Sequence, residues 1–421
     1  MLNVKSTLGG ETLRKFAASE SGNVAVIFSI AAIPLMMAFA GAIDVANLNR
    51  KSTELQNALD AAALTIGTVY YSGMSQADLE TLGRTVFSGN MLTAEGVPSE
   101  FDYEDADVSP LAASAEADGP DNYITVGSQL TMDPLVGWSF EWKVARTSVV
   151  RVQPGKPACV LALDKKSASA IKIQGSTHVE MEGCVIAANS SSDSAVTRDG
   201  SATLAAECVF TSGRTSGLGG SAADLDCPAP LEKQYPSDDP LAGVVPPIYA
   251  SCRSVPGGKT KTLSPGTYCN KTLSGEVTLE PGIYIMRGGR VNLGGNGFLK
   301  GDGVTIFLME DAEFSINGNE VVQLSPPATG PYAGISIYQE ISNDNTLSIN
   351  GTSGSFVDGF IYAPGAHVFY AGNAAASADG ECLRIVGNTI EFTGNSRYAA
   401  NCEGKLGDHE LIAGRHISIV R

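Results

Sequence analysis

The hydrophobic pattern is dominated by one uninterrupted apolar stretch near the N-terminus. No charged residue occurs between Glu20 and Asp44. As an α-helix, this stretch would be about 34 Å long, which is enough to cross the hydrocarbon core of a membrane. We therefore predict a cytoplasmic tail at residues 1–20 and a transmembrane anchor at residues 21–43.

A cleaved signal peptide is the alternative interpretation of this stretch. Ala38, Phe39 and Ala40 form an A-x-A-like site, and cleavage after Ala40 would release a secreted protein. The apolar run continues past that site to Ile43, which favours an uncleaved anchor. More basic residues precede the stretch than follow it closely, so we expect a cytoplasmic N-terminus and an external bulk of the chain. These basic residues are Lys5, Arg14 and Lys15 before the stretch, and Arg50 and Lys51 after it.

After the anchor, apolar residues recur at three- and four-residue steps, the period of a helix. We predict a helical stalk at residues 44–96. Its apolar stripe could contact a partner helix, or it could pack on the chain's own next helix near residues 75–92. The candidate residues for contact with a partner helix are Leu48, Leu55, Leu59, Asp60 and Ala62.

An acidic region follows the stalk. Between Thr85 and Trp142 the chain has eleven acidic residues and neither lysine nor arginine. For the acidic cluster at residues 102–107 we predict a solvated loop rather than an EF-hand calcium site, because Asp107 stands where the calcium loop needs a glycine. Segments that alternate apolar and polar residues flank this region, as half-buried strands do. We predict an acidic α+β connector at residues 97–157.

From residue 158 to residue 403, short apolar runs alternate with turns rich in glycine, asparagine, serine and proline. The sequence SAIKIQGS at 169–176 returns as SAVTRDGS at 194–201. Repeats of this length without helices predict a parallel β-helix, or β-solenoid, and a β-sandwich is the competing fold. With rungs about 4.8 Å apart, this region has room for about eleven rungs.

One segment interrupts the repeats. Residues 228–247 contain six prolines, which predicts a surface excursion or a linker. Residues 404–421 form a C-terminal segment. The predicted fold class is therefore mainly β, with a transmembrane helix, a helical stalk, a small α+β unit and a parallel β-solenoid.

All eight cysteines lie in the predicted solenoid, and an even number in one region is typical of disulfides formed in an oxidising compartment. The steps between the first three cysteines nearly equal the repeat, and adjacent rungs are near enough for a disulfide. We predict no metal site, since no pair has C-x-x-C spacing and the histidines are scattered. The candidate disulfide residues are Cys159, Cys184, Cys208, Cys227, Cys252, Cys269, Cys382 and Cys402.

Charge and motifs narrow the function. The net charge of -17 repels phosphate backbones, which excludes a nucleic-acid partner. The chain has no G-x-S-x-G, G-x-G-x-x-G, Walker or H-E-x-x-H motif, so we predict no enzyme activity and no cofactor. Asp238 and Asp239 are adjacent carboxylates, whereas a glycosidase needs two that converge from separate positions.

Several segments resemble a known family. The sequence GNVAVIFSIAAIPLMMAFAGAIDVANLNRKSTELQNALDAAAL at 22–64 resembles the N-terminal region of TadE/TadG-like proteins of the Tad, or Flp-pilus, assembly system. Later segments resemble the glycine-rich C-terminal region of some TadG-like members. Examples are CVLALDKKSASA at 159–170, DPLAGV at 239–244, LEPGIYIM at 279–286 and GFIYAPGA at 359–366.

The resemblance implies a single-pass protein of the bacterial inner membrane whose bulk is periplasmic or surface-facing. It implies pilus-assembly proteins as partners and a role in assembly or cell adhesion. The von Willebrand A metal motif D-x-S-x-S found in other TadG-like chains is absent, because Lys166 and Ala168 take the serine positions after Asp164. The prepilin glutamate is also absent, since Ile27 stands in its place after Gly22.

We therefore expect a non-enzymatic, membrane-anchored Tad component that presents a β-solenoid. The alternative is a membrane-tethered or secreted β-helix protein that binds or cleaves a polysaccharide, with a surface glycan as its partner.

Overall fold

The computed structural model of the chain divides into two compact units. The first comprises Met1–Gln153 and Ile417–Arg421, and the second comprises Pro154–His416. The structure describes residues 21–70, 74–92, 112–118, 121–132, 141–220, 223–249, 251–352, 354–372, 382–398, 406 and 409–420.

Two helices belong to the first unit, α2 (Ser21–Val69) and α3 (Gln76–Leu92). Helix α2 has 49 residues and is about 74 Å long. Ser75 caps α3, since its hydroxyl accepts a bond from the Asp78 amide at 3.3 Å and donates to the Asp78 carboxylate at 2.7 Å. Helix α3 packs against α2.

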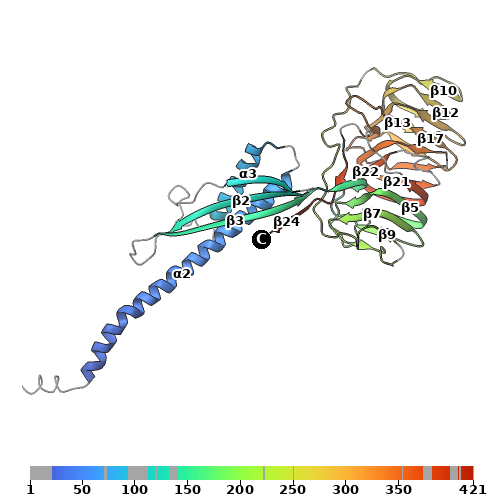
Figure 1. Cartoon of the computed structure of the whole chain (residues 1–421). Helices are drawn as coiled ribbons and strands as arrows, with labels where there is room; N and C mark the ends of the chain where they lie inside the picture. The colour runs from blue at the N-terminus through green and yellow to red at the C-terminus, as the bar shows by residue number, and fades with distance from the viewer. Residues whose placement is uncertain are drawn as a thin grey trace, which may run out of the picture. The chain divides into compact units, whose positions relative to one another are not determined.

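A four-stranded sheet completes the first unit, in the order β1-β2-β3-β24 (Figure 1). Strands β1, β2 and β3 pair antiparallel with one another. Alternate residues of β2 are buried against the helices, including Ile124, Val126 and Leu130. The fourth strand comes from the far end of the sequence. The bounds are β1 (Ala112–Asp118), β2 (Asp121–Met132), β3 (Trp142–Gln153) and β24 (His416–Val420).

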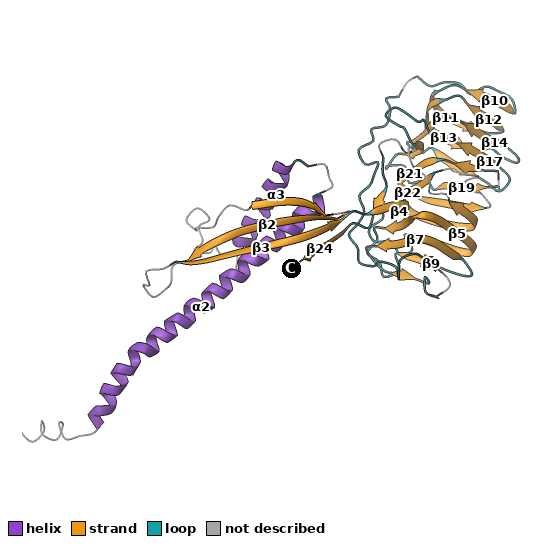
Figure 2. Ribbon diagram, in the orientation of Figure 1, coloured by secondary structure: helices purple, strands orange, loops and turns teal. Residues whose placement is uncertain are grey.

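The second unit is a parallel β-solenoid, which confirms the predicted fold class (Figure 2). The repeat is confirmed as well, because Ile171 pairs with Val196, the equivalent residue of the second copy. The strands are β4 (Lys156–Ala162), β5 (Ile171–Ala188), β6 (Val196–Arg198), β7 (Thr203–Thr211), β8 (Thr215–Ser216), β9 (Ala223–Leu225), β10 (Thr260–Leu263), β11 (Gly266–Leu273), β12 (Glu276–Leu279), β13 (Gly282–Val291), β14 (Phe298–Gly301), β15 (Val304–Met309), β16 (Glu313–Ile316), β17 (Val321–Leu324), β18 (Ile335–Gln339), β19 (Leu347–Gly351), β20 (Phe356–Val357), β21 (Gly359–Gly372), β22 (Leu383–Tyr398) and β23 (Ile412–Ala413).

One face of the solenoid shows the stacking most completely. We call it the strap face, after the segment at residues 228–249 that covers it. Parallel pairings connect its strands in the order β11, β13, β15, β18, β21, β22, β4, β5 and β7. The described strands thus form nine levels, and parallel bridges of Leu231 to Phe210 and of Cys252 to Thr267 add one level at each end, which matches the estimate of about eleven rungs.

The order of the levels differs from the order of the sequence. The first stack, β4 to β9, winds from the middle of the solenoid to one end. The chain then passes along the outside to the other end, and the second stack, β10 to β22, winds back to the middle. There β22 pairs in parallel with both β4 and β5. We call this junction the seam.

Candidate functional site

The first candidate functional element is the N-terminal part of α2. Its apolar side chains are exposed, with 69% exposure at Phe28, 73% at Met36 and 74% at Phe39. Among the described residues, α2 is the one helix that is long and apolar enough to cross a membrane. Because water disfavours so much apolar surface, this part of α2 fits a single-pass membrane anchor.

The C-terminal part of α2 carries the residues that the sequence assigned to a partner helix. Leu55, Leu59 and Ala62 are fully buried in the core of the first unit, and Leu48 packs partly against that core. Asp60 accepts a hydrogen bond from Gln56 Nε2 at 2.8 Å. Since α3 and the sheet cover this face, the stripe packs on its own chain, as the second of the two interpretations expected.

The cysteines form disulfides within the solenoid. One disulfide joins adjacent levels at β4 and β5, as the match between cysteine spacing and repeat predicts. Cys208 bonds Cys227 rather than Cys184, whose partner is Cys159. Cys382 is also disulfide-bonded, and Cys402 lies outside the described residues. The disulfides between described cysteines are Cys159–Cys184, Cys208–Cys227 and Cys252–Cys269, with Cα–Cα distances of 5.6, 5.4 and 5.6 Å.

The outside of the strap face carries a second apolar core. A column of outward-pointing apolar residues, in register from level to level, is buried rather than exposed. The column comprises Ile285, Phe307, Tyr338, Tyr362, Val386, Leu161, Ala187 and Phe210.

Residues 228–249, which we call the strap, cover this column together with a segment that includes Leu406 and Leu411. Leu241 of the strap is fully buried in the outer core. Contacts between the strap and the levels follow the order of the stack. They join Leu231 to Phe210, Ser237 to Asn189, Asp239 to Tyr362, Val244 to Tyr338 and Tyr249 to Arg287.

Three tyrosines hold the middle of the strap. The hydroxyl of Tyr362 donates to Asp239 Oδ2 at 2.8 Å, and the hydroxyls of Tyr332 and Tyr338 donate to strap carbonyls at 3.0 and 3.4 Å. The rings of Tyr338 and Tyr362 lie 4.9 Å apart, one above the other along the stack. Burial, followed by the charge of Asp239, raises the pKa of both phenols, so they remain donors at neutral pH.

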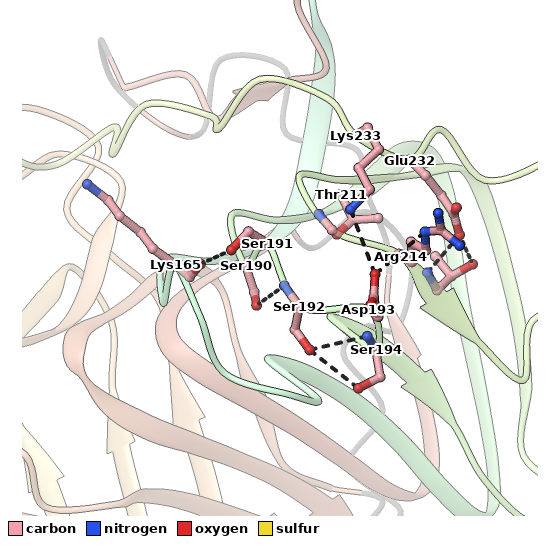
Figure 3. Close-up of polar contacts among 12 residues, drawn as sticks. Lys165, Ser190, Ser191, Ser192, Asp193, Ser194, Thr211, Arg214, Glu232 and Lys233 are labelled. Atoms are coloured by element: carbon pink, nitrogen blue, oxygen red, sulfur yellow. Dashed lines mark hydrogen bonds and ion pairs between the residues drawn. The ribbon is translucent and has the colours of Figure 1, made fainter.

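A serine-rich corner forms a cluster of polar contacts with its neighbours (Figure 3). It follows β5 and contains residues 190–194. Its backbone is fixed to the neighbouring corners, because the Ser191 amide donates to the Lys165 carbonyl and the Arg214 amide donates to the Ser192 carbonyl. Asp193 lies between Arg214 and Lys233 at 3.6 and 3.9 Å. These contacts form a rigid turn and bring no nucleophile and base together.

The acidic residues singled out in the sequence have structural contacts. Asp164, at the absent metal motif, accepts bonds from the amides of Lys166 and Ser167, as in an Asx turn. Asp238 pairs with Arg415 at 3.0 Å, while Asp239 faces Tyr362. Within the described part of the chain, no group of three or more potential ligands could hold a metal ion. The acidic cluster at residues 102–107 lies outside that part.

Sequence reasoning missed the strap tyrosines, the buried Leu241 and the return of β24 to the first unit. A signal for the tyrosines is present, since the pair Ile337-Tyr338 occurs again, one level later, as Ile361-Tyr362.

Comparison with known proteins assigns the anchor region. Residues 22–65 match the family model described as Putative Flp pilus-assembly TadE/G-like. This confirms the resemblance of residues 22–64 and locates it on α2. No curated protein and no solved structure gave a significant match.

Proposed function

We propose that this protein is a non-enzymatic component of a Tad-type pilus assembly or adhesion system, anchored in the bacterial inner membrane and presenting its solenoid outside the cytoplasm. The main support is that the TadE/G-like match falls on a helix whose first half is apolar and exposed. The disulfides agree with an oxidising compartment such as the periplasm.

The role follows from geometry rather than catalysis. The anchor holds the chain at the membrane, and the rigid stacked levels offer a long surface for contacts with pilus-assembly proteins. Of the described acidic residues of the strap, Glu232 accepts bonds from Thr215, Asp238 pairs with Arg415 and Asp239 accepts the Tyr362 hydroxyl. The polysaccharide-cleaving alternative therefore gains no support from them.

Deletion of the gene in its own organism tests the role in pilus assembly. We expect loss of surface pili and of attachment, and recovery when the gene is restored. Normal pili and normal attachment in the deletion strain would refute the proposal.

A charge-insertion variant tests the anchor separately. The double variant Ile30→Asp with Phe39→Asp places two carboxylates in the exposed apolar part of α2 and should move the protein from the membrane fraction to the soluble fraction. The matched control, Val245→Asp with Ile248→Asp, changes two exposed strap residues and should stay in the membrane fraction. Equal partitioning of the two variants would contradict an anchoring role for α2.

A further inference from the structure

The solenoid consists of two windings that meet at the seam. The seam depends on backbone pairing, for example between Val160 and Ile385 and between Ile171 and Ile390. Antiparallel pairing of β23 with β4 adds to it. Among the disulfides between described cysteines, none joins one stack to the other. The strap is one chain connection between the two stacks, and the chain that leads from β22 to β23, which pairs with β4, is a second.

Two of these disulfides fix the two ends of the strap. Cys227, directly before the strap, is bonded to Cys208 of β7 in the first stack. Cys252, just after the strap, is bonded to Cys269 of β11 in the second stack. These bonds attach the strap to the outermost levels at both ends of the solenoid.

The length of the strap does not by itself keep the seam closed. From the pairing of Leu231 beyond β7 to that of Cys252 beyond β11, the chain crosses ten steps of about 4.8 Å, or about 48 Å. The chain between these two positions could extend to about 70 Å. The strap thus has roughly 20 Å of slack, which must be taken up by contacts rather than by tension.

Local contacts take up this slack. The chain turns at Asp239, whose carboxylate accepts the Leu241 amide at 3.0 Å, and the turn places Leu241 in the outer core. Tyr332, Tyr338 and Tyr362 then hold the strap over the second stack. If these contacts were lost, the same slack would be available for separation of the stacks.

The strap disulfides are also more accessible than the disulfide inside the first stack. Cys252 is exposed and Cys227 is partly exposed, whereas Cys159 and Cys184 are buried. A soluble thiol can therefore attack the strap disulfides first.

We propose that the strap is a redox-sensitive lock on the seam. A dithiol attacks each strap disulfide through its thiolate, forms a mixed disulfide and then closes to its own disulfide. For each bond, two electrons and two protons pass to the protein, leaving Cys208, Cys227, Cys252 and Cys269 as thiols. Without these bonds, the ends of the strap are held by backbone hydrogen bonds such as those of Leu231 to Val209 and Thr211. The strap loosens, and the seam between β22 and β4 opens while the levels within each stack stay paired.

Amide hydrogen exchange of the full-length protein in detergent, before and after mild treatment with dithiothreitol, tests the lock. Seam amides are those of Leu163 and Ile390, which donate to Gly387 and Ala170. Comparison amides within the second stack are those of Glu280 and Val304. We expect about tenfold faster exchange at the seam and no change at the comparison amides. Alkylation and mass spectrometry should show modified strap cysteines while Cys159 and Cys184 remain bonded.

A pair of variants separates the lock from a general loss of disulfide stability. Cys227→Ser with Cys252→Ser should show fast seam exchange without reductant, whereas the control Cys159→Ser with Cys184→Ser should leave the seam less affected than the strap variant. A protease site inserted after the exposed Val245, cut in the purified folded protein, should reproduce the strap variant without any cysteine change. Seam exchange that is unchanged after cutting, or that rises equally at all four amides, would overturn the proposal.

Discussion

The strap face can be compared with another face of the solenoid, which we call the third face and which is formed by β10, β12, β14, β17 and β20. Both faces use the same parallel stacking, but they differ in what covers them. Every residue of β15 and β18 on the strap face is buried. Strands β12 and β17 on the third face alternate buried and partly exposed residues. The strap face therefore separates two apolar cores, whereas the third face separates one core from solvent.

This difference shows that two kinds of chain connection build the solenoid. The inner core forms from successive windings, so its contacts away from the seam lie about one repeat apart in sequence. The outer core requires a segment from between the stacks to cross the levels, so its contacts are distant in sequence: Asp239 and Tyr362 are 123 residues apart. Perturbing the inner core should have the larger effect, and perturbing the strap should reveal how firmly the outer core is held.

The largest effect is expected from truncation in the inner core. Phe314 of β16 is buried there, and Phe314→Ala should lower the free energy of unfolding by about 3–5 kcal/mol. The control Lys300→Ala, at an exposed position of β14, should stay within about 0.5 kcal/mol of wild type. Urea unfolding of both variants measures the difference, and a small loss for Phe314→Ala would mean that the inner core does not carry the fold.

The next effect tests the outer core through its single fully buried strap leucine. Leu241→Ala leaves a cavity under the strap and should cost about 2–4 kcal/mol, less than the inner-core variant because the strap can relax. Ile248 of the strap is 96% exposed, so Ile248→Ala should have no measurable effect. Equal unfolding midpoints for Leu241→Ala and Ile248→Ala would show that burial of Leu241 under the strap does not stabilise the protein.

The sequence repeat between residues 169–176 and 194–201 predicted the inner core but not the outer one. The repeated segment places Ile171 opposite Val196, because equivalent residues of two repeats lie opposite each other on adjacent levels. The strap is irregular and rich in proline, so nothing periodic indicates that Leu241 is buried or that Asp239 meets Tyr362. A usable signal was the uninterrupted apolar run VTIFLM at 304–309, since a strand open to solvent on one side would alternate. The return of β24 to the first sheet left no local signal at all.

A smaller effect is expected from the hydroxyl that joins the outer core to the strap. Tyr362→Phe keeps the ring but removes the donor to Asp239, and should cost about 1–2 kcal/mol at neutral pH. The control Tyr235→Phe, at an exposed strap position, should be neutral.

The pH dependence sharpens the same test. Burial, followed by the Asp239 charge, raises the pKa of Tyr362 above its unfolded value near 10. The contribution of the phenol is fully present below that unfolded value, because both states are then protonated. It declines as the pH rises from about 10 toward the folded pKa, since only the unfolded state then loses its proton. Wild type should therefore lose its advantage over Tyr362→Phe above about pH 10, and a constant difference across that range would argue against a buried donor.

The smallest effect separates two adjacent carboxylates of the strap. Asp238 is 81% exposed in its side chain and pairs with Arg415 at 3.0 Å, so Asp238→Asn should change the free energy of unfolding by no more than about 0.5 kcal/mol. Asp239→Asn alters the acceptor of both the Tyr362 hydroxyl and the Leu241 amide, and should cost about 1–2 kcal/mol. The two substitutions are chemically identical and lie next to each other, so chain composition and net charge are matched. Equal losses, measured by urea unfolding, would mean that the strap lies loosely over the solenoid; a clear excess for Asp239→Asn would locate its attachment at the turn before Leu241.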